Sequence, residues 1–150
     1  MIRRQIAIMI LLAISLAACG PHRNQYIPKP PARLSILLHP DFSANNGEVF
    51  WVVIKEVDDT RFSNDSYEEI ESILSTDEWE PDVLSVTSVV PGEERRVTVI
   101  KPYQRHVGFY FLVTDPQYSW KALLRNPIGS KCRVRIGQYD AVIDSVGGTW

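Results

Sequence analysis

The sequence predicts a mainly β protein: an antiparallel two-sheet β-sandwich with one short added helix. After residue 33, seven or eight short segments alternate apolar and polar side chains, which is the pattern of strands with one buried face. Turn signals such as Pro91-Gly92 separate these segments at regular spacing, as is typical of sandwiches. Only one stretch has helical periodicity, so we expect a single helix.

The chain begins with a targeting segment rather than with the sandwich. Arg3 and Arg4 precede an unbroken apolar run over residues 6–14, and small residues follow it. This order is typical of a secretory signal peptide, and the run is too short to remain as a membrane-spanning helix. The ending Leu16-Ala17-Ala18-Cys19 resembles the bacterial lipobox. We therefore expect residues 1–18 to be removed and Cys19 to be lipidated; the alternative is an ordinary secreted protein with a chance cysteine there.

Residues 19–33 form a lipidated, proline-rich spacer in this interpretation, and residues 34–150 form the sandwich domain. Proline favours extended backbone, so the spacer can hold the domain away from the lipid surface. Several acyl chains hold a protein on a membrane far more firmly than one chain does. Gly20 follows the cysteine where an Asp commonly retains Gram-negative lipoproteins at the inner membrane. By resemblance to that rule, we expect an outer-membrane protein that faces the periplasm.

The first two predicted strands flank the longest polar loop. Residues 34–38 alternate, with Leu34, Ile36 and Leu38 on one face, and residues 49–57 are apolar on both faces. A strand with two apolar faces must be covered on both sides. Further strands are expected over residues 83–90, 95–101, 107–114, 118–124, 131–136 and 139–146.

The predicted helix spans Ser66 to Leu74. Ser66 and Glu69 have the spacing of a capping box. Tyr67, Ile70 and Leu74 lie on one stripe of the helix. We expect this stripe to cover the outer face of the strand over residues 49–57, with Phe62 docked at the helix start.

The sequence gives poor support for catalysis. His39 and His106 stand apart from any Cys or His at metal-ligand spacing, and neither a nucleophile elbow nor a phosphate-binding loop is present. The acidic loop over residues 77–82 lacks the spacing and the glycine of a calcium loop, so a solvated loop is favoured. We therefore predict no enzyme, no cofactor and no metal site.

Composition also excludes some partners. The net charge is −2, and removal of the two signal arginines leaves 14 basic and 18 acidic side chains, about −4 in all. No basic patch indicates a nucleic-acid partner.

Two cysteines are present, and lipidation of Cys19 leaves Cys132 unpaired. The alternation over residues 131–136 puts Cys132 inward, which favours a buried small hydrophobe over a reactive thiol. Trp79 and Trp150 are either interface anchors or plugs of the sandwich end.

The loop after the first strand is the best candidate for binding, because loops carry function more often than strands do. Its residues are Pro40, Asp41, Phe42, Ser43, Ala44, Asn45, Asn46, Gly47 and Glu48. From composition alone, a merely tolerated surface loop is an equal alternative. Phe42 is its only large apolar side chain and hence its best anchor, while Asp41 can brace the loop backbone. Because loop length costs little, we expect that residues 43–46 can be shortened without loss of stability.

The order of these features resembles a known family of bacterial lipoproteins. The segments that carry the resemblance are 38–41 (Leu-His-Pro-Asp), 62–67 (Phe-Ser-Asn-Asp-Ser-Tyr), 90–93 (Val-Pro-Gly-Glu), 107–111 (Val-Gly-Phe-Tyr-Phe) and 120–122 (Trp-Lys-Ala). Together with the lipobox, they are similar to the outer-membrane lipoprotein of the type VI secretion system, the TssJ (SciN/VasD) family. The resemblance covers about residues 34–124 and points to a divergent member.

The resemblance implies a transthyretin-like sandwich with an added helical piece, and a structural rather than enzymatic role. Members anchor the secretion complex to the outer membrane and bind the periplasmic C-terminal domain of its large inner-membrane component. The family makes that contact through the loop that corresponds here to Pro40–Glu48. Two other functions remain open from the residues: a periplasmic ligand-binding lipoprotein with an apolar cleft between its sheets, and a hydrolase with an unrecognised site.

Overall fold

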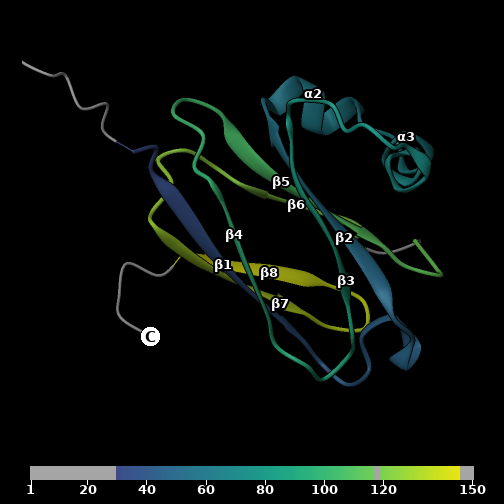
Figure 1. Ribbon diagram of the computed structural model, residues 1–150. Coiled ribbons are helices and arrows are strands. Elements are labelled where there is room, and N and C mark those ends of the chain that lie inside the picture. Colours follow the sequence, from purple (N-terminus) through teal and green to yellow (C-terminus); the bar gives the residue numbers. More distant parts are fainter. Residues whose placement is uncertain (1–29, 117–118, 146–150) are drawn as a thin grey trace, which may run out of the picture. The chain divides into compact units, whose positions relative to one another are not determined.

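The computed structural model describes residues 30–116 and 119–145 (Figure 1). The predicted signal peptide, Cys19, most of the spacer and Trp150 lie outside the described residues. Within them the chain forms eight strands and two short α-helices, together with 3-10 turns at Ala44–Gly47 (η1) and Ile73–Ser75 (η2). The elements are β1 (Arg33–Pro40), β2 (Phe50–Val57), α2 (Asp59–Asn64), α3 (Tyr67–Ser72), β3 (Val83–Val89), β4 (Arg95–Ile100), β5 (His106–Leu112), β6 (Lys121–Leu124), β7 (Lys131–Ile136) and β8 (Ala141–Ser145).

Two four-stranded sheets make the predicted sandwich. Sheet A has the order β4-β1-β7-β8 and sheet B the order β3-β2-β5-β6. All pairs are antiparallel except β1 and β7, which run parallel. The predicted two-sheet β-sandwich is confirmed, and its single departure from antiparallel pairing among the described strands is the β1–β7 pair. Alternation of side chains identifies a strand but does not reveal its direction, so the pairing of two strands so far apart in the chain could not be predicted from it.

The core between the sheets follows the predicted alternation. Leu34, Ile36 and Leu38 of β1 are fully buried, as are Val134 on the neighbouring strand β7 and Phe109 on β5 of the opposite sheet. Aromatic and branched side chains of both sheets fill the space between them, so a continuous apolar core holds the two layers together.

The outer face of sheet B has a second apolar cluster beneath the helices, as the two-faced strand pattern predicted. Val53 and Val57 of β2 and Tyr110 of β5 are buried there with Ile70 of α3. The helices cover only part of β2, however, since Trp51 is exposed on the same face of that strand. In Figure 1 the helices lie over only one end of β2 and β5.

Helix α3 confirms the predicted start of the helix. Ser66 Oγ accepts from the Glu69 backbone N–H, and the Glu69 carboxylate accepts from the Ser66 N–H, which completes the capping box. The α-helix ends at Ser72 rather than at Leu74 and continues as η2. None of the described helices is long and apolar enough to cross a membrane.

Helix α2 is a second helix, where the sequence pattern predicts only one. The Asp58 side chain caps it by accepting from the Arg61 N–H at 2.8 Å. Lys121 Nζ reaches its other end from β6 and donates to the carbonyls of Phe62 (2.7 Å) and Asp65 (3.1 Å). This helix has only six residues and no buried side chain, so no apolar period could reveal it.

Candidate partner-binding end of the sandwich

Four connections meet at one end of the sandwich, among them the loop that the sequence singled out. The strand registers bring them together: Pro40 lies beside Ile136, Phe50 opposite Val89, and Trp51 opposite Leu112. The connections are residues 41–49, 90–94 and 137–140, together with the described parts of the β5–β6 connection, 113–116 and 119–120. A surface at this end is therefore composed of several chain segments, not of one loop.

Backbone hydrogen bonds, one within the loop and one to β7, close the loop between β1 and β2. The Asp41 N–H donates to the Ile136 carbonyl at 2.8 Å, and the Ala44 N–H donates to the Asp41 carbonyl at 3.0 Å. Asn45, Asn46 and Gly47 then take three successive left-handed conformations, with φ of 48°, 56° and 81°. Asn and Gly are the residues that adopt this region at least cost, so the Asn-Asn-Gly turn signal has a direct structural reason.

Asn45 holds this loop to its neighbour. Its side-chain oxygen accepts from the Thr114 backbone N–H at 2.8 Å, and its amide donates to the Glu48 carbonyl at 3.1 Å. The residue is only 7% exposed. Ala44 is fully buried in the core between the sheets. The middle of the loop is thus part of the folded domain, and the expectation that it can be shortened freely is not supported by its packing.

The nine predicted binding residues consequently divide into two groups. Pro40, which is the last residue of β1, is buried together with Ala44 and Asn45. The exposed members are Asp41, Phe42, Ser43, Asn46, Gly47 and Glu48. Only the second group can offer side chains to a partner without a change of fold.

Phe42 is the most prominent of the exposed residues. Its side chain is 84% exposed, although large aromatic side chains usually lie inside a domain. It contacts the turn between β3 and β4 at Gly92. Three more apolar side chains are exposed at the same end: Val49 before β2, Trp51 within it, and Val90 after β3.

These three neighbours were not predicted as candidates, because the outer face of residues 49–57 was expected to be covered by the helix. The pattern places Val49 and Trp51 on that face, but α2 and α3 lie over the other end of β2. Val90 appeared to be an ordinary strand end. Their exposure depends on how far the helices extend over sheet B, which no local pattern reveals.

A polar cavity of about 200 Å³ adjoins the loop on its other side. It is lined by Asn45, Asn46, Val113, Asp115, Gln138 and Tyr139. Gln138 Nε2 donates to Asn46 Oδ1 at 3.2 Å across its mouth. This link ties the loop to the β7–β8 turn and further restricts its exposed half.

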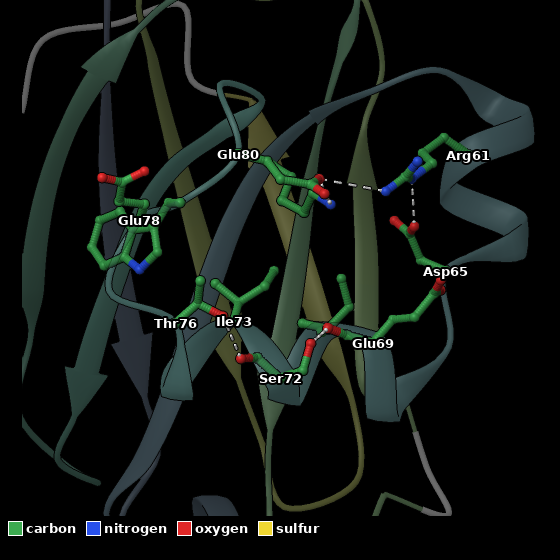
Figure 2. A pocket seen from close by; sticks show the side chains of 11 residues that line it. Arg61, Asp65, Glu69, Ser72, Ile73, Thr76, Glu78 and Glu80 are labelled. Atoms are coloured by element: carbon green, nitrogen blue, oxygen red, sulfur yellow. Dashed lines mark hydrogen bonds and ion pairs between the residues drawn. The ribbon is translucent and has the colours of Figure 1, made fainter.

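A second cavity of about 200 Å³ lies beneath the helices, away from the loop (Figure 2). Its charged lining consists of Lys55, Arg61, Asp65, Glu69, Glu78 and Glu80. Figure 2 shows Arg61 between the carboxylates of Asp65 and Glu80, which its guanidinium contacts at 2.9 and 3.7 Å. The nearby Asp65 carboxylate raises the pKa of Arg61.

Lys55 is the most deeply buried cation of this second cavity. It is 2% exposed and lies 3.4 Å from Asp82 and 4.0 Å from Glu80. A buried charge is tolerated when it is paired, and these contacts account for it without a ligand. Two carboxylates from the acidic loop, which was expected to be solvated, therefore serve to neutralise Lys55.

The histidines considered for catalysis also have structural partners. His39 Nδ1 contacts Glu94 at 2.9 Å, and His106 Nε2 lies 3.4 Å from Asp59. The described residues contain no group of three metal-ligating side chains.

Cys132 is fully buried, as predicted, and burial raises the pKa of its thiol to about 12. Trp79 is half exposed on the second cavity and does not plug the sandwich end.

Comparison with known proteins now decides the family. The model of the IglE N-terminal domain matches residues 51–136, which is more than half of the chain. The chain belongs to the IglE N-terminal domain family. No curated protein matches this IglE-type chain.

Solved structures share the fold of this IglE-type sandwich. The type VI secretion lipoprotein TssJ1 from Pseudomonas aeruginosa has a TM-score of 0.62 and 21% identity, covering 80% of this chain and all of its own. A second match is Serratia marcescens Lip, described as a membrane-bound component of the type VI secretion system. It has a TM-score of 0.59 and 12% sequence identity, and the match covers 79% of this chain and 99% of Lip. A chain of a type VI membrane complex has a TM-score of 0.57 and 14% sequence identity, and the match covers 76% of this chain and 98% of that one. The predicted resemblance to TssJ, and the sandwich that it implied, are confirmed.

Proposed function

We propose that this protein is a lipid-anchored structural component of a type VI secretion membrane complex. The observation that carries the proposal is the match over almost the full length of TssJ1 and Lip, two lipoproteins of that system, in a chain that has a lipobox at residues 16–19. In this proposal residues 1–18 are the signal peptide, residues 19–33 a spacer with lipidated Cys19, and residues 34–150 the sandwich. The acyl chains hold the protein at the outer membrane, and the domain faces the periplasm.

The proposed partner is the periplasmic C-terminal domain of the large inner-membrane component. The chain that matches from a type VI membrane complex supports a role within such an assembly. The proposed contact is the exposed half of the β1–β2 loop, with Phe42 as its anchor, because buried aromatic side chains dominate interface energies. The protein acts as a scaffold and catalyses no reaction.

The packing does not favour the alternative of a ligand-binding lipoprotein. That function needs an apolar cleft between the sheets, yet Phe50, Phe109 and Phe111 are buried in that space with the branched side chains of sheet A. Both cavities described above lie outside it. No observation supports a hydrolase.

The test is a pull-down of the acylated protein from detergent-solubilised envelopes, with mass spectrometry of what is retained. We expect the large inner-membrane component to be enriched with wild type and lost with Phe42→Ala. Tyr103→Ala removes an aromatic side chain that is 89% exposed elsewhere on the surface, and it is the matched control. Equal recovery with both variants would exclude Phe42 from the interface, and no recovery with wild type would exclude the partner.

A further inference from the structure

The turn between β3 and β4 has a backbone reason for its glycine. The Glu93 N–H donates to the Val90 carbonyl at 3.1 Å, Pro91 occupies the second position, and Gly92 has φ of 80° at the third. This is the pattern of a type II turn, whose third residue must be left-handed. Asn also adopts that conformation at modest cost, so the turn alone does not demand glycine.

A second constraint on Gly92 comes from the β1–β2 loop. A Cβ atom built on Gly92 would collide with Cδ1 and Cε1 of the Phe42 ring and lie 3.1 Å from its Cζ. The Gly92 N–H also donates to the Pro40 carbonyl at 3.1 Å. The ring therefore lies directly against the Gly92 backbone, and the two connections are joined beneath it.

Gly47 provides an internal comparison. Its φ of 81° matches that of Gly92, but its nearest neighbour would be the Phe42 carbonyl oxygen at an ordinary 3.8 Å. At Gly47 only the backbone angle calls for glycine. At Gly92 a side chain would in addition displace the Phe42 ring from its position.

The contact with Gly92 limits the orientations of the Phe42 ring, although the ring faces solvent. An exposed side chain that is already held in one orientation loses less conformational freedom when a partner binds it. Two further apolar side chains are exposed on the same connections: Val90 starts the turn that contains Gly92, and Val49 precedes the strand that pairs with β3. The arrangement fits a partner with an apolar recess the size of a benzyl group.

We propose that Gly92 is a positioning residue of the docking surface: it holds the Phe42 ring outward for insertion into an apolar recess of the inner-membrane component. This inference rests on the proposed function, because it needs that partner. It adds the β3–β4 turn to a surface that the sequence confined to one loop. Gly92 itself does not have to touch the partner.

A double-mutant cycle tests the coupling. The variants are Gly92→Asn, which accepts the left-handed angle but adds a side chain under the ring, Phe42→Ala, and both together. Their dissociation constants are measured against the purified periplasmic domain of the partner, and their melting temperatures are measured alongside. We expect Phe42→Ala to weaken binding about 30-fold or more and Gly92→Asn about 3- to 10-fold. The double variant should bind no more weakly than Phe42→Ala alone, because no ring remains to be displaced.

Independent losses that multiply in the double variant would overturn the proposal, as would unchanged affinity of Gly92→Asn. A measurement without any partner covers the case in which Gly92→Asn does not fold. The Gly92 Hα resonances of wild type should be shifted upfield by the ring current relative to those of Phe42→Ala, and their coincidence would overturn it too. If wild type does not bind the partner domain but the ring-current shift is present, the proposed function and the docking role fail while the ring contact stands.

Discussion

The hydroxyl of Tyr110 donates a hydrogen bond to the buried carboxylate of Asp65, 45 residues earlier in the chain. Tyr110 lies on the outer face of sheet B, and Asp65 lies in the link between α2 and α3. Arg61 holds the other carboxylate oxygen at 2.9 Å. Lys121 donates to the Asp65 carbonyl, so two strands and a helix fix one residue. These bonds attach the helices to the sheet more specifically than apolar contact does.

Tyr110→Phe should lower the free energy of unfolding by about 1–3 kcal/mol, because it leaves one buried oxygen of Asp65 without a donor. Urea unfolding at neutral pH measures the effect. The matched control is Tyr103→Phe, which removes the same hydroxyl from a side chain that is 89% exposed and should change stability by less than about 0.5 kcal/mol. Equal effects of the two substitutions would contradict the assigned role of the Tyr110–Asp65 bond.

The same bond should make stability sensitive to alkaline pH. Burial, and then the hydrogen bond to Asp65, raise the pKa of Tyr110 above its ordinary value of 10.0. The unfolded chain therefore releases this proton first, so the contribution is complete below about pH 10 and is lost as pH rises further. The difference in unfolding free energy between wild type and Tyr110→Phe should shrink above pH 10. A difference that stays constant to pH 11.5 would exclude this linkage.

Two substitutions in the β1–β2 loop should have different effects: one should lower stability, and the other should weaken partner binding. Asn45→Ala removes the two side-chain hydrogen bonds of Asn45, to Thr114 and Glu48, and should cost about 1–3 kcal/mol in urea unfolding. Phe42→Ala should cost less than about 0.5 kcal/mol because its side chain is exposed, while it abolishes capture of the proposed partner.

Replacing residues 43–46 by two glycines should now lower the melting temperature, since Ala44 and Asn45 are buried. A truncated loop that melts like wild type would show that this packing contributes little.

Cys132 should behave as an inert core residue. Its pKa near 12 and its complete burial leave almost no accessible thiolate at neutral pH, so a polar maleimide should label the native protein far more slowly than the urea-unfolded protein. Cys132→Ala should cost about 1 kcal/mol, on the scale of one buried methyl-sized group, without affecting partner capture. Comparable labelling rates of native and unfolded protein would place the thiol at the surface instead.

The membrane anchor can be tested independently of the fold. Cys19→Ser removes the proposed acylation site, so we expect the variant to be uncleaved or soluble and to leave the washed outer-membrane fraction. An isolated domain over residues 31–150 should keep the melting temperature of the full mature protein, because it retains Arg33 of β1 and the Ala32 carbonyl that accepts from the Lys101 N–H. Retention of Cys19→Ser in the outer membrane after a high-salt wash would show that something other than lipid holds it there.

Local patterns in the sequence determined much of this structure. The alternation of apolar side chains predicted the strands, and the Ser66–Glu69 spacing predicted the start of α3. Two apolar faces on residues 49–57 predicted that β2 is covered outside as well as inside. The burial of Cys132 followed from its place in β7. Each of these features depends on residues within one turn or one strand, so a single sequence is enough to reveal them.

Only the tertiary structure decided what depends on distant segments. Strand direction is invisible in alternation, so the parallel pairing of β1 and β7 was missed. Helix α2 has no apolar stripe, and it is held by Arg125, Lys121 and its own cap. The reach of the helices left Trp51 exposed, and the strand registers brought Gly92 beneath Phe42. The sequence pointed to a loop at one end of a sandwich, whereas folding determined which side chains of that loop are buried and which turn supports the one that faces outward.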